Sequence, residues 1–357
     1  MRRQALQMAG FAGVVVAIQL AASLTGHVYH LTQLTMSAYY SLVVLGLCIL
    51  TGYAGQISIG HAGFFAIAGY LSALLTTHDL SSHGGAIVSG LASAGILVRR
   101  PDLYGGELLT VHPWPACVVA VLSAVVVAYA IGGPVLKLKG HYLAMATLGF
   151  GIIVYRIVLG TELVGAADGI YDVPGFPLFP GIEVTGKSSL RLVNYYLAWG
   201  AVILGMLLLL NLVRSRVGRA LASIHGAEDA AEAMGIPTAR YKLKIFVVSA
   251  AFAAVAGVLL THYNGGIGPS ESSVMKSVRY LAIVAIGGMA NLWGALSMSL
   301  VLNYLSLRGF FGTYDDAVFG GILILIMLFA PDGLLRKGLS DDLRGLLRRQ
   351  DAGKEPA

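Results

Sequence analysis

Residues 214–244 read RSRVGRALASIHGAEDAAEAMGIPTARYKLK, a polar and basic stretch between two long apolar segments, 197–213 and 245–260. Three arginines follow the first segment and three cations precede the second: Arg214, Arg216, Arg219, Arg240, Lys242 and Lys244. Cations within a few residues of apolar spans are typical of a cytoplasmic loop. Between them, the alanine-rich residues 228–234 favour a short helix that ends at Gly235 and Pro237. We therefore predict a cytoplasmic helix that the protein presents to a partner.

The composition of this 357-residue chain is that of an integral membrane protein, with 57% hydrophobic residues, 12% charged residues and a mean hydropathy of +0.77. A soluble domain carries roughly 25% charged residues. The net charge of +6 does not indicate nucleic acid, because the cations stand at the ends of spans and set orientation there. Cys48 and Cys117 lie in apolar runs and are interpreted as buried structural thiols.

Ten segments are candidate membrane-spanning helices, since a helix needs ~20 mostly apolar residues to cross a bilayer. The predicted fold class is therefore an all-α integral membrane protein, a polytopic bundle of about ten transmembrane helices with glycine-broken helices and a cytoplasmic coupling helix. The first span follows a basic N-terminus without a small-residue cleavage site, and we interpret it as a retained helix. The candidate spans are residues 8–25, 36–53, 61–77, 114–134, 142–160, 193–213, 245–263, 278–290, 292–307 and 316–330.

The distribution of cations predicts the orientation of these spans. With a cytoplasmic N-terminus, 16 Lys and Arg residues fall in cytoplasmic segments and 7 in external ones, which favours both termini in the cytoplasm. Residues 1–339 then form the membrane domain, with external loops 78–113 and 161–192, and residues 340–357 form a short charged tail. The two external loops are either plain surface loops or a docking surface for an external partner.

One stretch of the chain, residues 51–70, interrupts its apolar character with glycines and polar groups. It contains Gln56, Ser58 and His61 at or near membrane depth, among Gly52, Gly55, Gly60, Gly63 and Gly69. A helix broken inside hydrocarbon must be buried in protein or line water, because unpaired backbone groups are costly there. Such breaks mark translocation pathways in transporters, and glycines equally permit close helix packing. Both interpretations stay open, and His61 is either a structural hydrogen-bonding group or a proton relay.

A second glycine-rich break occurs at residues 285–296, where AIGGMANLWGAL places one amide, Asn291, between two apolar arms. A diverged repeat of the first break is one explanation of this similarity. Ionisable groups deep in spans are scarce, Arg156 and His61 being the main ones, and neither has an obvious carboxylate partner in a neighbouring span. Carriers coupled to protons or sodium use relays of such groups, so the scarcity argues against a self-powered carrier.

Residues 181–188, GIEVTGKS, match the P-loop pattern G-x-x-x-x-G-K-[ST] letter for letter. A working P-loop needs a buried strand before it and a helix of a nucleotide-binding domain after it. Here a Pro-rich loop precedes the pattern and a membrane span follows, so we reject nucleotide binding at Lys187. The sequence offers no catalytic constellation, and we expect no enzyme activity, no cofactor and no metal site in this chain.

Several segments taken in order resemble the LivM-type permease family of bacterial branched-chain amino-acid ABC importers, over nearly the whole chain. Residues 229–235, DAAEAMG, are similar to the coupling motif EAA-x₃-G of ABC importers, with aspartate in place of glutamate. The segments that carry the resemblance are GYAGQISIGHAGFFAIAGY (52–70), LKGHYLAMATLGF (138–150), ADGI (167–170), GRALASIHGAEDAAEAMGI (218–236), YKLKIFVVSAAFAAVAG (241–257), AIGGMANLWGA (285–295) and FAPDGLL (329–335).

The resemblance implies a permease subunit that moves branched-chain or other hydrophobic amino acids across the membrane. Its partners would be a second homologous permease, two cytoplasmic ATPase subunits, a periplasmic substrate-binding protein and membrane lipid. Contact with the ATPase would rest on Glu228, Asp229, Ala230, Ala231, Glu232 and Gly235. The translocation pathway would include Gln56, Ser58, His61, Gly63 and Asn291.

Other functions compete with this one. One alternative for the loop helix is a plain amphipathic helix that lies on the lipid surface. Permeases of the same family for urea, short amides or aromatic acids would share these motifs. A secondary transporter or channel without ATP predicts charge pairs inside the membrane and needs no coupling helix. A purely structural membrane scaffold would not need glycine-broken spans.

Overall fold

The computed structural model describes residues 2–81, 90, 95–101, 107–138, 140–179 and 181–329. Helices α1 (Arg2–Leu24) and α2 (His30–Cys48) come first, and α2 continues through a π-helical turn, η1 (Ile49–Tyr53). The remaining helices are α3 (His61–Thr77), α5 (Pro113–Val135), α6 (His141–Gly160), α7 (Arg191–Arg214), α8 (Arg216–Gly226), α9 (Glu228–Ala233), α10 (Thr238–Asn264), α11 (Val274–Gly287), α12 (Leu292–Leu307) and α13 (Asp315–Phe329).

Each of the ten predicted spans falls on one of these helices. Within the described part of the chain, six helices are long and apolar enough to cross a membrane: Leu6–Leu24, His30–Tyr53, Pro113–Val135, His141–Gly160, Ser188–Arg214 and Thr238–Asn264. Two further apolar helices, α3 and α12, are shorter. The protein is therefore a mostly helical, polytopic chain, and the number of ten spans stays a prediction.

The start of α2 and the end of α11 differ from the predicted ends of the corresponding spans. The span predicted at 36–53 begins earlier, at His30. The span predicted at 278–290 runs instead from Val274 to Gly287, because Gly288 and Ala290 both take positive φ angles of 98° and 64°. A helix cannot continue through such residues. The third predicted span, 61–77, coincides with α3.

The description of the chain as all-α is also incomplete, because the described residues include three small antiparallel sheets at the ends of helices. Strand β1 (Leu97–Pro101) pairs with β2 (Glu107–Val111), and β4 (Phe176–Phe179) pairs with β5 (Ile182–Val184). Strand β3 (Ile170–Tyr171) pairs with β6 (Gly266–Ile267), which joins the segment after α6 to the segment after α10. The predicted loop 78–113 contains β1 and β2, and the predicted loop 161–192 contains β3, β4 and β5, so neither is helical throughout.

Helix α2 lies at the centre of the bundle and packs against α7, α10, α11 and α12. Its most apolar window, within His30–Tyr53, is 94% buried, against 28% for α5 and 33% for α6. Small residues permit this close packing: a Cβ at Gly46 would lie 2.8 Å from the Phe252 Cβ of α10. Peripheral helices expose apolar side chains such as Leu122 and Leu208 instead. Lipid-facing surfaces have this character, because hydrocarbon solvates apolar side chains.

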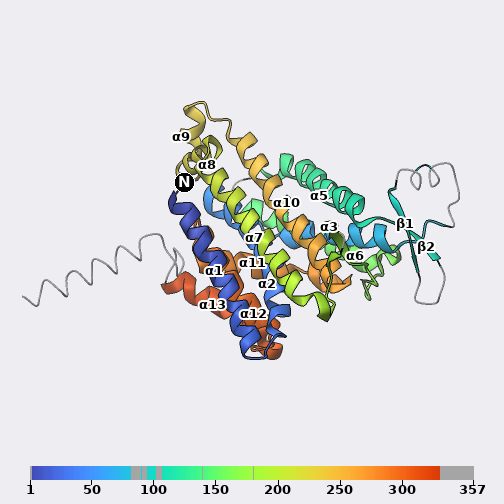
Figure 1. The fold of residues 1–357 in the computed structure, drawn as a ribbon. Helices are drawn as coiled ribbons and strands as arrows, with labels where there is room; N and C mark the ends of the chain where they lie inside the picture. The colour runs from blue at the N-terminus through green and yellow to red at the C-terminus, as the bar shows by residue number, and fades with distance from the viewer. Residues whose placement is uncertain are drawn as a thin grey trace, which may run out of the picture.

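The ends of the molecule differ in what they carry (Figure 1). Helices α8 and α9 lie at one end beside the N-terminus, and we call this the loop end; strands β1 and β2 lie at the other, which we call the strand end. Both glycine breaks, 54–60 and 288–291, lie at the loop end. Helix α1 begins at that end, so α2 returns to it before the first break; α10 also begins there, so α11 returns to it before the second. The tail at 340–357 lies outside the described residues.

Candidate functional site

Helix α8 begins directly after α7 and folds back onto the bundle. The Ser215 hydroxyl accepts hydrogen bonds from the amides of Val217 (3.1 Å) and Gly218 (3.4 Å), which caps the helix. Leu221 and Ile224 are buried, so the apolar side of α8 faces the protein. Gly218 is required at the turn because a Cβ there would lie 2.0 Å from the Val213 carbonyl oxygen. These contacts hold the loop against the ends of α7 and α10.

Helix α9 coincides with the predicted loop helix, and two devices fix it. Lys242, in the first turns of α10, forms an ion pair with Glu228 at the α9 N-terminus. The C-terminus ends in a Schellman arrangement, in which the amide of Gly235 donates to the Glu232 carbonyl (2.9 Å) and that of Ile236 to the Ala231 carbonyl (3.0 Å). Gly235 has a φ of 83° and no heavy atom near its Cβ position, so its backbone conformation, rather than packing, requires glycine.

The predicted coupling residues therefore divide into two groups. Ala231 is buried against the protein, and Glu228 is held by Lys242, so both position the helix. Asp229, Ala230, Glu232 and Gly235 are exposed and form its outward surface. Met234, which we did not predict, belongs to the same surface and is 84% exposed. A methionine beside the end of a predicted loop helix is a sequence feature that would have identified Met234 as a candidate contact residue.

Helix α8 contacts the first glycine break directly. Gly55 has a φ of 66°, and a Cβ there would lie 2.7 Å from His225 Nδ1 near the end of α8. Gly55 and Ile57 are exposed, whereas Gln56 and Ser58 are buried. Helix α8 and the break are thus in direct contact, with no residue between them.

Hydrogen bonds from several helices fix the first break. His61 is fully buried, with Nδ1 3.1 Å from Ser58 Oγ and Nε2 2.7 Å from Ser249 Oγ of α10. The amide of Ile59 donates to Thr147 Oγ1 of α6 (3.0 Å). The amide of Ala62 donates to the Ser277 hydroxyl of α11 (3.1 Å). The amides of Ile59 in the break and of Ala62 in the first turn of α3 are thus satisfied by side chains of neighbouring helices.

Tight glycine packing joins the first break to the second. A Cβ at Gly52 would lie 2.0 Å from the Ala290 amide nitrogen, and a Cβ at Gly294 would lie 2.0 Å from the Gly287 carbonyl oxygen. Gly63 packs on the ring of Phe150, which a Cβ would approach to 3.0 Å. The two breaks differ in form, since the first is an irregular segment after a π-helical turn and the second a tight turn.

The predicted pathway residues are thus brought together at one junction, which comprises residues 52–63 and 287–294. Ser58, His61 and Gly63 take part in its packing and hydrogen bonding. Asn291 precedes α12, and its carbonyl accepts from the Ala295 amide (2.9 Å). Gln56 is 3% exposed, and neither polar atom of its side chain has a hydrogen-bond partner among the described residues. A buried amide of this kind is a candidate for ligand or water contact.

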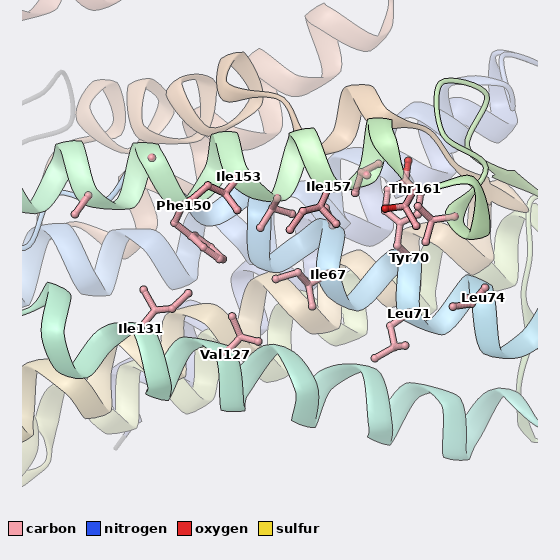
Figure 2. Close-up of a pocket in the computed structure, with 16 residues that line it drawn as sticks. Ile67, Tyr70, Leu71, Leu74, Val127, Ile131, Phe150, Ile153, Ile157 and Thr161 are labelled. Atoms are coloured by element: carbon pink, nitrogen blue, oxygen red, sulfur yellow. The ribbon is translucent and has the colours of Figure 1, made fainter.

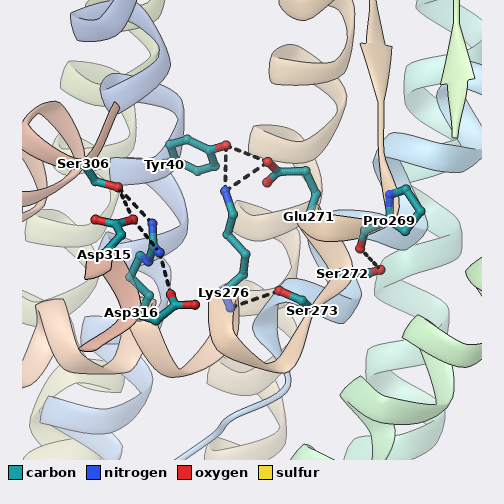
Figure 3. Close-up of polar contacts among 10 residues, drawn as sticks. Tyr40, Pro269, Glu271, Ser272, Ser273, Lys276, Ser306, Asp315 and Asp316 are labelled. Carbon is teal, nitrogen blue, oxygen red and sulfur yellow. Dashed lines mark hydrogen bonds and ion pairs between the residues drawn. The ribbon is translucent and has the colours of Figure 1, made fainter. Parts of the chain in front are cut away.

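A second polar region, at the strand-end side of α11, was missed by the sequence analysis (Figure 3). Glu271, in the short helix η5 (Pro269–Ser272), accepts hydrogen bonds at Oε1 from the Tyr40 hydroxyl (2.9 Å) and from Lys276 Nζ (3.0 Å). Lys276 Nζ also donates to Tyr40 Oη (3.1 Å) and lies 4.5 Å from the centre of its ring. The three side chains tie η5 and α11 to the central helix α2.

One turn further along α11, Arg279 pairs with both carboxylates at the start of α13. Its Nη2 lies 2.7 Å from Asp315 Oδ2 and 2.7 Å from Asp316 Oδ1, and its Nη1 donates to Ser306 Oγ (3.0 Å). The sequence alone did not indicate this pairing of α11 with α13, because the partners are remote in sequence and only the fold brings them together.

An apolar groove of about 720 Å³ lies between α5 and α6, with α3 as its floor (Figure 2). Ile67, Leu71, Val127 and Ile153 are among the residues that line it. Tyr70 and Thr161 lie together at one end, where they supply hydroxyl groups. The groove suits an aliphatic or hydrocarbon group, since its walls carry no charged side chain.

The P-loop pattern lies in a context that nucleotide binding does not use. Residues 182–184 form β5, which pairs antiparallel with β4 in a two-stranded sheet, and Ser188–Leu190 form a short 3₁₀ turn before α7. Lys187 is exposed and lies 4.0 Å from Glu183. A cradle of backbone amides between a buried strand and a soluble helix is not formed here.

A glycine-broken bundle of apolar helices with an ordered loop helix at one end defines the class of polytopic membrane permeases. Residues 29–327 match the family model for the branched-chain amino acid transport system / permease component. The chain belongs to this family, as its sequence motifs predicted.

Named relatives support this assignment. The chain is 31% identical over 323 residues to the high-affinity branched-chain amino acid transport system permease protein LivM of Escherichia coli, covering 84% of this chain and 68% of that protein. It is 28% identical to LivH of Salmonella typhimurium, over 84% of this chain and 92% of that protein, and 26% identical to BraD of Pseudomonas aeruginosa, over 86% and 96%. No solved structure matches the chain.

Proposed function

We propose that this chain is the membrane-spanning subunit of an ABC importer and forms, with a second homologous permease, the pathway for branched-chain or other hydrophobic amino acids. Two cytoplasmic ATPase subunits drive the cycle, and a periplasmic substrate-binding protein delivers the substrate. Both termini and the loop end face the cytoplasm of a bacterial cell, and the strand end faces the periplasm. The excess of cations in the segments of the loop end supports this orientation.

The contact between α8 and the first glycine break carries the proposal. An ATPase docked on the outward surface of α9 would move α8, and His225 stands directly against Gly55 of the break. Asp229, Ala230, Glu232, Met234 and Gly235 supply a small, partly acidic surface that suits a groove in a partner protein. Residues 52–63 and 287–294 are then the mechanical joint at the cytoplasmic side of the pathway, with Gln56, Ser58, His61, Gly63 and Asn291 in or beside it.

The strand end is the surface on which we place the binding protein. The β3–β6 and β4–β5 pairs and the described parts of 78–113 form a structured surface there rather than a single connecting turn. The exposed apolar faces of the peripheral helices remain for lipid and for the second permease. The amino-acid substrate follows from the family, and the aliphatic walls of the groove between α5 and α6 favour it over urea, short amides or aromatic acids.

The experiment is reconstitution of the chain with the second permease and ATPases encoded beside it. Proteoliposomes that hold ATP should take up leucine only when the binding protein is outside, and orthovanadate should abolish this uptake. Urea, acetamide and phenylacetate serve as competing substrates. Uptake of leucine without ATPases, driven by a proton gradient, would instead establish the rival secondary transporter, for which the ion pairs of Lys276 and Arg279 are the supporting observation.

A further inference from the structure

The cluster around Glu271 has hydrogen-bonding capacity that the chain itself does not use. Glu271 Oε1 accepts two hydrogen bonds, whereas its Oε2 is buried without a partner among the described residues. The hydroxyls of Tyr70 and Tyr280 are likewise buried and unpartnered, in side chains that are 3% and 1% exposed. One carboxylate oxygen and two hydroxyls are therefore available to a ligand. Buried polar groups are ordinarily paired, so an unused set of this size calls for an explanation.

These groups belong to one neighbourhood. The rings of Tyr40 and Tyr280 have centroids 6.2 Å apart, and Tyr40 bonds directly to Glu271. The short helix η5, which holds Glu271, packs against α3, which holds Tyr70, and against α6. Lys276 supplies the positive charge of the neighbourhood, and Glu271 supplies the negative charge.

Tyr70 also connects this neighbourhood to the apolar groove. Figure 2 shows Tyr70 beside Thr161 at one end of the groove, with Ile67 and Ile153 further along its walls. A molecule with a polar head at Tyr70 could therefore place an aliphatic tail between α5 and α6. The groove and the cluster share this residue, so they can bind two parts of the same small molecule.

We propose that Glu271, Lys276 and Tyr70 form a binding subsite for a zwitterionic α-amino acid whose aliphatic side chain enters the groove. The free Glu271 Oε2 accepts the α-ammonium group, and Lys276 Nζ with the tyrosine hydroxyls donates to the α-carboxylate. The proposal rests on the proposed function, of which it specifies a substrate contact. It also predicts selectivity, because the Glu271–Lys276 pair is neutral in itself, so a ligand with one charge alone would add a buried charge that nothing compensates.

The structural alternative is that the ion pair only fastens η5 to α2, and Glu271→Gln separates the two roles. Glutamine retains an oxygen that accepts from Tyr40 and Lys276, so the fastening survives, while the negative charge is lost. Lys276→Met removes the positive charge and retains the apolar stem. The matched control is Asp316→Asn, which makes the same carboxylate-to-amide change in the second ion-pair cluster of α11, where Arg279 keeps its bond to Asp315.

The test uses the complete transporter in proteoliposomes and a diazirine analogue of leucine. After illumination, adducts are mapped by mass spectrometry to residues 140–164 and 66–74. In the wild type, leucine should displace the label, whereas 4-methylpentanoate and isoamylamine, which each carry one of the two charges, should not. Glu271→Gln and Lys276→Met should each lower labelling about tenfold, as expected for one lost charge-assisted hydrogen bond, and Asp316→Asn should leave labelling unchanged.

Equal labelling of wild type and both variants would overturn the subsite, as would adducts that leucine does not displace, which mark a hydrocarbon-binding groove only. Equal displacement by the singly charged analogues would do the same. If Glu271→Gln fails to assemble on size exclusion, Tyr70→Phe decides, with a severalfold loss of labelling expected and no loss contradicting the proposal. Failure of the wild type to import leucine would sink the proposed function, whereas import with unaffected variants would sink the subsite alone.

Discussion

The two ends of the molecule are held together by different kinds of contact. At the loop end, backbones pack closely, and a Cβ at Gly52 would lie 2.0 Å from the Ala290 amide nitrogen. At the strand-end side of α11, the long side chains of Lys276 and Arg279 form ion pairs with their partners. The contact between Gly52 and Ala290 leaves no free space, because backbone atoms pack against backbone atoms. The ion pairs leave donors and acceptors unused, such as Glu271 Oε2. We infer that the closely packed junction of the two breaks is suited to transmit movement, and that the Glu271 cluster, which has unused hydrogen-bonding groups, is suited to accept a ligand.

The largest effect should follow from Gly52→Val, which forces side-chain atoms into the Ala290 backbone. Because neither backbone segment can yield cheaply, we expect a loss of at least about 3 kcal/mol and no assembled complex. The measurement is yield of monodisperse protein in detergent. Gly200→Ala in α7, where a Cβ meets nothing within 4 Å, is the control and should assemble normally. Normal assembly of Gly52→Val would show that the two breaks are not in contact.

Next in size is the effect of Ala230→Arg on the outward surface of α9. Ala230 is exposed, so arginine should leave the helix folded but prevent close docking of an ATPase, with loss of transport and membrane insertion intact. Co-purification of the ATPase subunits checks this. Ala222→Arg, at an exposed position of α8, is a matched control outside α9. If Ala230→Arg retains both the ATPases and uptake, the docking surface lies elsewhere.

Gly235→Asp tests whether the C-terminal end of α9 must stay ordered for coupling. A φ of 83° strains any side chain, at a cost of order 1 kcal/mol, so α9 should fray and uptake should fall. Gly235→Asn, which tolerates the left-handed region better, should retain more activity. The ratio of uptake rates of the two variants is the measurement, and equal rates would show that the α9 terminus does not matter for coupling.

These residues also show what could be inferred from the sequence. The apolar segments, the loop helix at 228–234 and its end at Gly235 depend on local periodicity, helix propensity and glycine conformation, and each was predicted near its observed place. The contact of Gly52 with Ala290 and the pairing of Arg279 with Asp315 join segments remote in sequence. Periodicity carries no information on such contacts. The end of α11 at Gly287 was missed because the left-handed conformation of Ala290 depends on its packing.

A smaller effect concerns access to the first break. Ile57 is 44% exposed and Ser58 is 2% exposed, although they are neighbours. In a background without Cys48 and Cys117, Ile57→Cys should react with a water-soluble thiol reagent at least about tenfold faster than Ser58→Cys, because attack requires an accessible thiolate. If the break borders the pathway, trapping ATP hydrolysis should change the rate at Ser58→Cys. A rate that is low in every state would make the break a packing device only.

A still smaller effect concerns the pH dependence of the turn at Asp79, at the strand end. The Asp79 carboxylate accepts a hydrogen bond from the Ser81 hydroxyl (2.5 Å) and from the amides of Ser81 and Leu109. These hydrogen bonds lower the pKa of the Asp79 carboxyl group. Because the folded pKa lies below the unfolded one, these bonds stabilise the turn above the unfolded pKa, and the stabilisation is lost as pH falls through the folded pKa. Hydrogen exchange at the Leu109 amide should lose protection over that range. Asp79→Asn, which cannot titrate, should show no such step, and a step in both would exclude Asp79 as its origin.

The smallest effect should come from Lys187→Ala. In a true P-loop this lysine would contact phosphate oxygens, and its removal would cripple nucleotide binding. Here Lys187 has a side chain that is 69% exposed, and its partner Glu183 is 4.0 Å away, so the change should cost less than about 0.5 kcal/mol. ATP-driven uptake and nucleotide binding by the complete transporter should stay at the wild-type level, because both belong to separate ATPase subunits. A marked fall in nucleotide binding with the ATPases still attached would mean that residues 181–188 are a P-loop after all, and the strand end would then face the cytoplasm.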